Sequence, residues 1–400
     1  GVEGGDTVTI FTSRMEHGSG VWSAPVEVAR EEGASLQNPV WFWDPATENG
    51  VKKTGTLRLL YTSQSGMDQS SSHVKEILSL DRGSSWEEDG GRTLFINHGP
   101  FIKNKIIPGR HPGEWLLPMY YTPFGASPRA IDSQYSSLRR STDDGESWDQ
   151  EVRLSELGSG LVQPSILAMP SGRLVAFFRQ RFSGEEGLNY VWRSESDDDG
   201  HTWTEPSPTP LPNPNKAIQA IALDSGAVLI IFNNNHGNVR RETGEDGKRR
   251  VVDTRHYPMS AGLSYDGGST WPYVRDLEEE YAPNLEYSYP SVVQSPDGAI
   301  HITHTWSQPP CRRVAIRYMQ VDEEWVKGQW EWGATRGVYV PEPSLQASTD
   351  ADIGGQGHSL YYRSLTPHGT SLLLIVVFLS LLAYLYQTRL AAQPSARFWV

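Results

Sequence analysis

An eight-residue pattern, Ser-x-Asp-x-Gly-x-(Ser/Thr)-Trp, occurs four times in this chain and constrains its fold more than any other feature. The copies occupy residues 79–86, 141–148, 196–203 and 264–271. The Asp can accept hydrogen bonds from turn amides, the Gly allows a positive φ, and the Trp can pack on a neighbouring strand. Each copy therefore suits a tight hairpin turn. A fifth, altered copy precedes Trp22, with His17 and Ser19 in place of the Asp and Gly.

We call the four copies boxes. They recur about every 60 residues, a period that holds several short strands and is typical of a β-propeller. Each repeat also has two apolar runs joined by a short turn, then a third strand that leads into the box. Turns such as 170–172, 224–226 and 296–298 are strong hairpin signals. Five units are complete or nearly so, and residues 7–28 match the second half of a sixth, which could lend its outer strand to the last unit. The sequence predicts an all-β fold, a six-bladed β-propeller over residues 1–335 with an incomplete first blade.

The boxes, their spacing and the stretch Tyr287-Ser288-Tyr289-Pro290 resemble the sialidase (neuraminidase) superfamily. The resemblance implies that the boxes lie at the rim, away from the active site, and that a tyrosine attacks the anomeric carbon of the sugar. Tyr287 stands where that family has its tyrosine, and Tyr289 remains an alternative because successive strand residues point to opposite faces. Glu286 is our own inference for the base, since the family's glutamate usually comes from another blade. The family's first arginine and catalytic aspartate belong to the blade that is incomplete here.

Polar residues gather where a propeller brings its loops together near the axis, at the starts of first strands and the ends of second strands. Amides, cations and tyrosines at such positions suit a sugar with a carboxylate, although they could also simply cap strand ends. Arg193 and Arg317 are added as candidates for the carboxylate-binding arginines that the resemblance implies. The predicted substrate-binding residues are Asn38, Lys105, Tyr121, Gln163, Arg179, Arg193, Asn215 and Arg317.

Composition narrows the possible partners. The formal net charge of −13 argues against nucleic acid as a partner. The single cysteine, Cys311, excludes an internal disulfide framework and provides no metal-binding motif. We expect no cofactor and no metal.

The C-terminal region has a different composition. Residues 369–388 carry no charged side chain, and Arg389 and Arg397 follow them. About twenty uncharged, mostly apolar residues suffice for one transmembrane helix, and the positive-inside rule places the tail in the cytosol. The sequence thus predicts a polar linker over 336–368, a membrane span over 369–388 and a cytosolic tail over 389–400. The propeller would then be luminal or extracellular, in an endomembrane such as the Golgi or at the cell surface.

Three functions are consistent with these features. The first is a membrane-anchored exo-glycosidase of the sialidase type that acts on terminal acidic sugars of an oligosaccharide or glycoconjugate. The second is a polysaccharide lyase, in which a tyrosine or a histidine such as His98 or His236 removes a proton next to a uronate carboxylate. The third is a glycan-binding propeller without catalysis.

Overall fold

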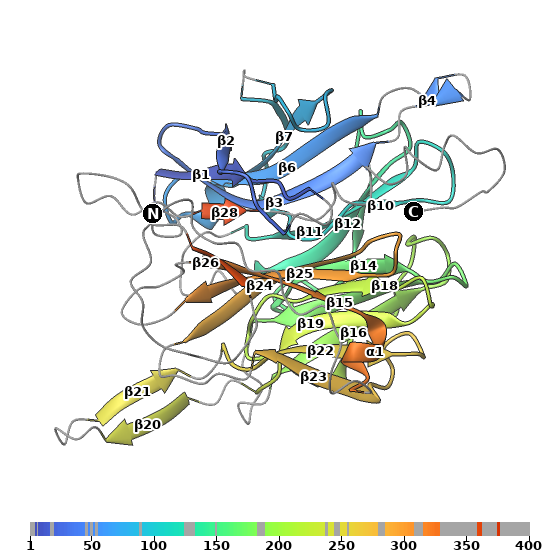
Figure 1. Ribbon diagram of the computed structural model, residues 1–400. Coiled ribbons are helices and arrows are strands. Elements are labelled where there is room, and N and C mark those ends of the chain that lie inside the picture. The colour runs from blue at the N-terminus through green and yellow to red at the C-terminus, as the bar shows by residue number, and fades with distance from the viewer. Residues whose placement is uncertain are drawn as a thin grey trace, which may run out of the picture.

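The computed structural model describes most of residues 5–328 and two short segments beyond them (Figure 1). The described residues are 5, 7–16, 20–44, 47–48, 51–52, 55–87, 90–123, 133–148, 150–181, 189–236, 239–243, 249–253, 256–278, 285–307, 315–328, 358–361 and 374–376.

Antiparallel sheets account for nearly all the regular structure, and five of them form propeller blades. Blade 1 consists of β3 (Ala34–Asp44), β6 (Thr56–Gln64), β7 (His73–Ser79) and β8 (Arg92–Phe95). Blade 2 consists of β9 (Pro100–Phe101) and β10 (Ile107–Pro108), which both pair with β11 (Trp115–Tyr121), followed by β12 (Tyr135–Ser141) and β13 (Gln150–Arg153). Blade 3 consists of β14 (Leu161–Ala168), β15 (Leu174–Gln180), β16 (Tyr190–Ser196) and β17 (Ser207–Pro212).

Blade 4 consists of β18 (Gln219–Ala222), β19 (Val228–Asn233), β22 (Met259–Ser264) and β23 (Tyr273–Glu278). Blade 5 consists of β24 (Glu286–Gln294), β25 (Ile300–Ser307), β26 (Ala315–Val321) and β27 (His358–Tyr361). Two small hairpins, β4–β5 (Thr47–Glu48 and Val51–Lys52) and β20–β21 (Val239–Thr243 and Arg249–Asp253), project from this body (Figure 1). The remaining elements are the 3-10 turn η1 (Gln69–Ser71) and the short helix α1 (Glu323–Val326), whose Val326 is buried in the core of blades 4 and 5.

The all-β propeller is confirmed, but the predicted number of six blades is wrong, because the described residues form five. The predicted partial blade contributes β1 (Thr7–Thr12) and β2 (Val26–Ala29), which pair with each other. β1 also pairs in parallel with β3, so both strands extend the sheet of blade 1 instead of forming a sheet of their own. A two-stranded hairpin is marginal by itself, and joining an existing sheet edge satisfies its free backbone groups.

Two segments near the C-terminus differ from the predicted domain layout. The last blade takes its outer strand, β27, from residues predicted to be a linker, and not from residues 7–28. Within the predicted span 369–388, the structure describes only β28 (Leu374–Val376), a strand that pairs in parallel with β1; the rest of the span lies outside the described residues. This Leu-Ile-Val run suits a strand edge. Among the described residues, no helix has the length and apolar character needed to cross a membrane.

Each box forms a closed turn stabilised by its own side chains. In the first copy, Asp81 accepts hydrogen bonds from the Ser85 amide at 2.8 Å and the Ser85 hydroxyl at 2.6 Å, and Ser79 donates to the same carboxylate. These hydrogen bonds lower the pKa of Asp81 to about 2. The residue before each box Gly also has a positive φ, between 58° and 69°, so two successive left-handed residues make the turn.

Arginines of the preceding repeat attach each box to its neighbour. Arg14 donates to the Arg82 carbonyl at 2.6 Å, Arg92 to the Gly145 carbonyl at 2.7 Å, Arg140 to the Asp199 carbonyl, and Arg193 to the Gly267 carbonyl at 2.8 Å. We call these four contacts the box latches. They connect consecutive repeats at the face that carries the boxes.

Candidate functional site

The site lies at the opposite face from the boxes. Arg110, in the turn between β10 and β11, donates to the Gly172 carbonyl in the corresponding turn of blade 3 at 3.0 Å and forms an ion pair with Asp199 of a box. The turns that follow the inner strands therefore share one face with the boxes. The inner strands β3, β14 and β24 must begin at the other face, as the sequence predicts.

Three inner strands have the same bulge at this face. In β3, β14 and β24 the strand register shifts at Asn38-Pro39, Gln163-Pro164 and Tyr289-Pro290. The residue before each proline has a φ between 50° and 55°, which is uncommon for a residue other than glycine. Proline has no amide hydrogen to leave unpaired, and a bulge changes the direction in which a side chain points. Blades 1, 3 and 5 thus hold an amide, an amide and a phenol at equivalent backbone positions.

Arg179 connects two of the predicted binding residues. It lies near the end of β15, where its Nε donates to Asn215 Oδ1 at 2.8 Å and its Nη1 donates to Gln163 Oε1 at 3.2 Å. Both acceptors are neutral amides, and the two hydrogen bonds orient the guanidinium. The structure therefore brings Arg179, Gln163 and Asn215 together, as the sequence predicts.

Two lysines bring further positive charge to the axis. Between β9 and β10 the inner strand of blade 2 is interrupted, and burial alternates so that Ile102, Asn104 and Ile106 are buried while Lys103 and Lys105 are half-buried. Asn104 Nδ2 fixes this segment to blade 3 through the carbonyls of Gln163 at 3.1 Å and Pro164 at 3.0 Å.

The two ammonium groups reach β24 in blade 5. Lys103 Nζ lies 3.4 Å from the Pro290 carbonyl, and Lys105 Nζ lies 3.2 Å from the Val292 carbonyl. Burial lowers the pKa of both lysines to about 8, and the charge of Arg179 adds to this effect at Lys103. We call Lys103, Lys105, Gln163, Arg179, Asn215 and Tyr289 the axial cluster.

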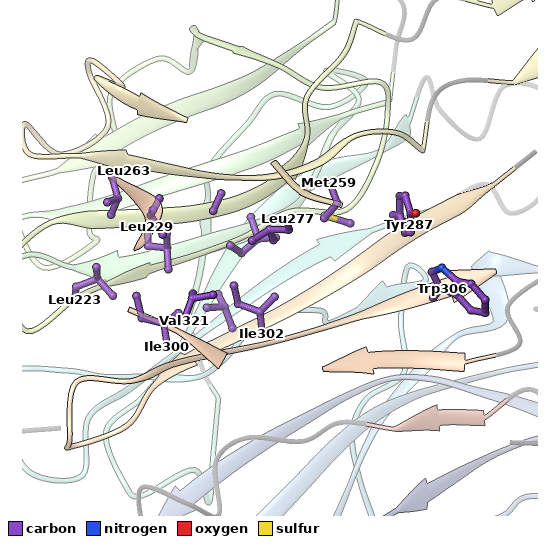
Figure 2. Packing of buried hydrophobic residues seen from close by; sticks show 14 of the residues in the cluster. Leu223, Leu229, Met259, Leu263, Leu277, Tyr287, Ile300, Ile302, Trp306 and Val321 are labelled. Carbon is purple, nitrogen blue, oxygen red and sulfur yellow. The ribbon is translucent and has the colours of Figure 1, made fainter. Parts of the chain in front are cut away.

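The two tyrosines of the predicted catalytic stretch occupy different environments. Tyr287 is fully buried in the hydrophobic cluster between blades 4 and 5, with Met259, Leu285 and Trp306 (Figure 2). The Asn233 amide donates to its carbonyl at 3.0 Å. Tyr289 is half-buried at the bulge, next to the carbonyl that Lys103 contacts. The prediction of Tyr287 as the nucleophile does not agree with this position inside the core, so Tyr289 is the better candidate.

Glu286 begins β24 and is mostly buried. Its Oε1 accepts a hydrogen bond from the Ser288 hydroxyl at 2.7 Å and lies 3.8 Å from His256 Nε2. It therefore lies at the end of the inner strand that faces the site, on the same strand as Tyr289.

Three predicted binding residues lie elsewhere. Arg193 forms a box latch and also pairs with Glu195 at 2.6 Å, which places it at the face of the boxes. Tyr121 is buried, stacks on Tyr135 at 5.1 Å and accepts a hydrogen bond from Arg139 at 3.0 Å. Each side chain is used for packing between strands or blades.

Arg317 is the third, and it belongs to a buried ionic cluster between blades 4 and 5. Its guanidinium pairs with Glu278 and lies over the Trp306 ring at 5.0 Å, while His304 Nε2 is 3.1 Å from the other Glu278 oxygen. His304 Nδ1 donates to the Thr305 carbonyl at 3.1 Å. Burial by itself would raise the pKa of Glu278, but His304 and Arg317 outweigh it and hold that pKa below its usual range.

Sequence reasoning missed Lys103 and the Glu278–His304–Arg317 cluster. The alternation across Ile102–Ile106 could have indicated Lys103, because side chains two residues apart share a face. The ionic cluster had no comparable signal, since it joins strands of two blades.

The two histidines considered for the lyase lie in different environments. His98 is exposed, whereas His236 Nδ1 lies 3.0 Å from the Asn189 carbonyl.

Comparison with models of protein families matches residues 1–302 to the BNR repeat-like domain. This chain belongs to that family. The match includes all four boxes, the three bulges and the axial cluster of this BNR-repeat protein. No curated protein matches the chain.

Solved structures of glycosidases share the fold of this BNR-repeat protein. A Hadza microbial sialidase aligns with a TM-score of 0.57 and 15% identity, over 78% of this chain and 59% of that chain. The intramolecular trans-sialidase from Ruminococcus gnavus aligns with a TM-score of 0.55 and 14% identity, over 79% of this chain and 88% of that chain.

An α-L-arabinofuranosidase from Fusarium graminearum aligns with a TM-score of 0.53 and 11% identity, over 80% of this chain and 87% of that chain. The resemblance to sialidase-type propellers is confirmed by the family match and by these neighbours. At such low identity the neighbours establish the fold only.

Proposed function

We propose that this BNR-repeat protein is an exo-glycosidase that removes a terminal acidic sugar from a glycan. The positive charge of the axial cluster is the observation that carries the proposal. Among the described residues, the ammonium groups of Lys103 and Lys105 contact backbone carbonyls and no carboxylate. Charges in a protein interior are normally paired, and an anionic ligand would supply the missing partner. The glycosidases that share the fold support a sugar as that ligand.

In this proposal Tyr289 is the nucleophile. Its oxygen bonds to the anomeric carbon as the glycosidic bond breaks, Glu286 takes the phenol proton, and the departing sugar oxygen takes a proton from water. Water then cleaves the glycosyl–tyrosine bond, so the released sugar retains its configuration. A neutral phenol suits an acidic sugar because it does not repel the substrate carboxylate. Arg179, held by Gln163 and Asn215, would bind that carboxylate.

A lyase is the second candidate, and Lys103 is the observation that favours it. An amine with a pKa of about 8 beside the bulge could accept the proton next to a uronate carboxylate that Arg179 neutralises. The third possibility, a glycan-binding propeller, needs only the axial cations and no catalytic group.

Product analysis separates these functions. We expect incubation with glycans that end in sialic acid or glucuronic acid to release a free acidic monosaccharide, whose anomeric configuration can be followed by NMR from the first minutes. A product that absorbs in the near ultraviolet would identify an unsaturated uronate and favour the lyase. Saturable binding of the same glycans without any product would favour the binding module.

We also propose that residues 369–388 attach the protein to a membrane, with the propeller luminal or extracellular, in a state in which Leu374–Val376 does not pair with β1 as it does in this structure. The uncharged sequence supports this. We expect the full chain to enter the detergent phase in a phase-partition experiment, and a chain that ends after residue 361 to remain in the aqueous phase. Recovery of both from the aqueous phase would exclude the anchor.

A further inference from the structure

His256 lies at the face of the site, in the segment that leads into the third strand of blade 4. β22 runs from there to the fourth box, so it begins at the face opposite the boxes. The fully buried Asn233 fixes this segment to blade 5, because its Nδ2 donates to the His256 carbonyl at 2.9 Å and to the Tyr287 carbonyl at 3.0 Å. Asn235 Nδ2 donates to the Tyr257 carbonyl at 2.6 Å. The backbone that carries His256 is therefore held against β24.

The imidazole of His256 lies beside the carboxylate of Glu286. Its Nε2 is 3.8 Å from Glu286 Oε1, the oxygen that accepts a hydrogen bond from the Ser288 hydroxyl at 2.7 Å. The His256 side chain is 17% exposed and that of Glu286 is 11% exposed, so both groups are enclosed but still reach solvent. A carboxylate this close favours the protonated form of an imidazole. The distance exceeds a hydrogen bond, so Glu286 does not hold the proton on Nε2.

Glu286 and Tyr289 lie at different depths along the inner strand of blade 5. β24 begins at the face of the site with Glu286, and Tyr289 comes three residues further inward. At the rise of a strand this separation is at most about 10 Å. In the proposed reaction Tyr289 attacks the terminal sugar at the inner level, and the rest of the glycan extends outward past Glu286. His256 is therefore on the side of the departing group.

We propose that His256 is the general acid that protonates the departing sugar oxygen, in place of water. The proton moves from Nε2 to the glycosidic oxygen as that bond breaks, while Tyr289 bonds to the anomeric carbon and Glu286 takes the phenol proton. In the second step neutral His256 takes a proton from the attacking water, and Glu286 returns its proton to the phenol, so both groups are restored. This inference rests on the proposed glycosidase. A positioned acid typically accelerates such a step about 10²- to 10⁴-fold.

The test compares two leaving groups on the same acidic sugar. N-acetylneuraminic acid and glucuronic acid are each linked either to 4-nitrophenol or to galactose, and kcat/KM reports the step in which the glycosidic bond breaks. 4-Nitrophenol departs as a stable anion without an acid, whereas galactose needs a proton. His256→Gln should therefore lower kcat/KM for the galactose glycoside about 100- to 10,000-fold, and should leave that for the nitrophenyl glycoside within about tenfold.

Ser288→Ala is the matched comparison, because Ser288 contacts the same oxygen of Glu286. Loss of this hydrogen bond disturbs the base that both substrates need, so kcat/KM should fall by a similar factor for both. If His256 acted only by positioning Glu286, His256→Gln would show the same equal loss. Selective loss for the galactose glycoside therefore separates a proton donor from a positioning residue.

A second measurement needs no variant and decides the question if His256→Gln fails to fold. In the unmodified protein, the ratio of kcat/KM for the galactose glycoside to that for the nitrophenyl glycoside should fall as the pH rises and His256 loses its proton. Glu286, Lys103 and Lys105 also titrate, but they act on the nucleophile or on the acidic sugar, which both substrates share. Their effects therefore cancel in the ratio.

The results distinguish failure of this inference from failure of the proposed glycosidase. Equal losses for both substrates in folded His256→Gln, full activity of that variant toward the galactose glycoside, or a ratio that is independent of pH would each overturn the role of His256 and leave the glycosidase standing. If the unmodified protein cleaves neither nitrophenyl glycoside, the proposed glycosidase is overturned, and the role of His256 with it.

Discussion

Replacing Tyr289 by Phe is expected to lower turnover of an acidic glycan by roughly three orders of magnitude or more, because the transition state loses the oxygen that forms the new bond. Binding should change little, since the ring and the bulge are retained. The measurement is kcat together with the dissociation constant of the released acid, both taken at neutral pH.

Tyr287→Phe is the matched control, two residues away on the same strand. Its ring is fully buried, so we expect a lower unfolding temperature. Its kcat should stay within about tenfold of that of the unmodified protein. The opposite pattern, with turnover lost only in Tyr287→Phe, would return the nucleophile to Tyr287. Full activity in both variants would eliminate tyrosine attack.

The second large effect concerns stability. Glu278→Ala removes the carboxylate that both Arg317 and His304 contact between blades 4 and 5. Removing one partner of a buried ion pair typically lowers the free energy of unfolding by about 3–5 kcal/mol. Denaturant unfolding at pH 7 should show a loss of that size in the free energy of unfolding.

The pH dependence of this loss follows from the lowered pKa of Glu278 in the folded protein. A carboxylate with a lowered folded pKa contributes its stability above its unfolded pKa of about 4.3, and the contribution disappears as the pH falls through the folded pKa. The difference between Glu278→Ala and the unmodified protein should therefore shrink in acid. A difference that is equal at pH 7 and pH 3 would show that lost packing, and not lost charge pairing, causes the effect.

The repeats were predictable because their signals are local. Each box closes a turn with its own side chains, and each hairpin has its own turn residues, so four boxes and five hairpin pairs indicate the blades without any long-range information. The number of blades was not predictable in this way. Whether Thr7–Thr12 and Val26–Ala29 begin a new sheet or extend an existing one depends on the edge they meet, and β1 meets β3.

The site was predictable in part for the same reason. Gln163, Arg179 and Asn215 were found because strand ends converge near the axis in any propeller. The choice between Tyr287 and Tyr289 depended on a bulge, which interrupts the alternation from which side-chain direction is inferred. Arg193 and Arg317 were predicted to bind substrate from their residue type alone. Arg193 instead contacts a box carbonyl, and Arg317 contacts Glu278, and both partners belong to a neighbouring blade.

The repeated bulge separates the choice of side chain at the site from the pairing of the strand that carries it. The backbone at Asn38, Gln163 and Tyr289 is set by the bulge and the following proline, so the side chain can be exchanged without altering the pairing of the strand. Blades 1, 3 and 5 thus have three positions with the same backbone conformation, of which two carry an amide and one carries a phenol. A point substitution at one of these three positions would therefore change a group that faces the site and leave the turns formed by the boxes on the other face as they are.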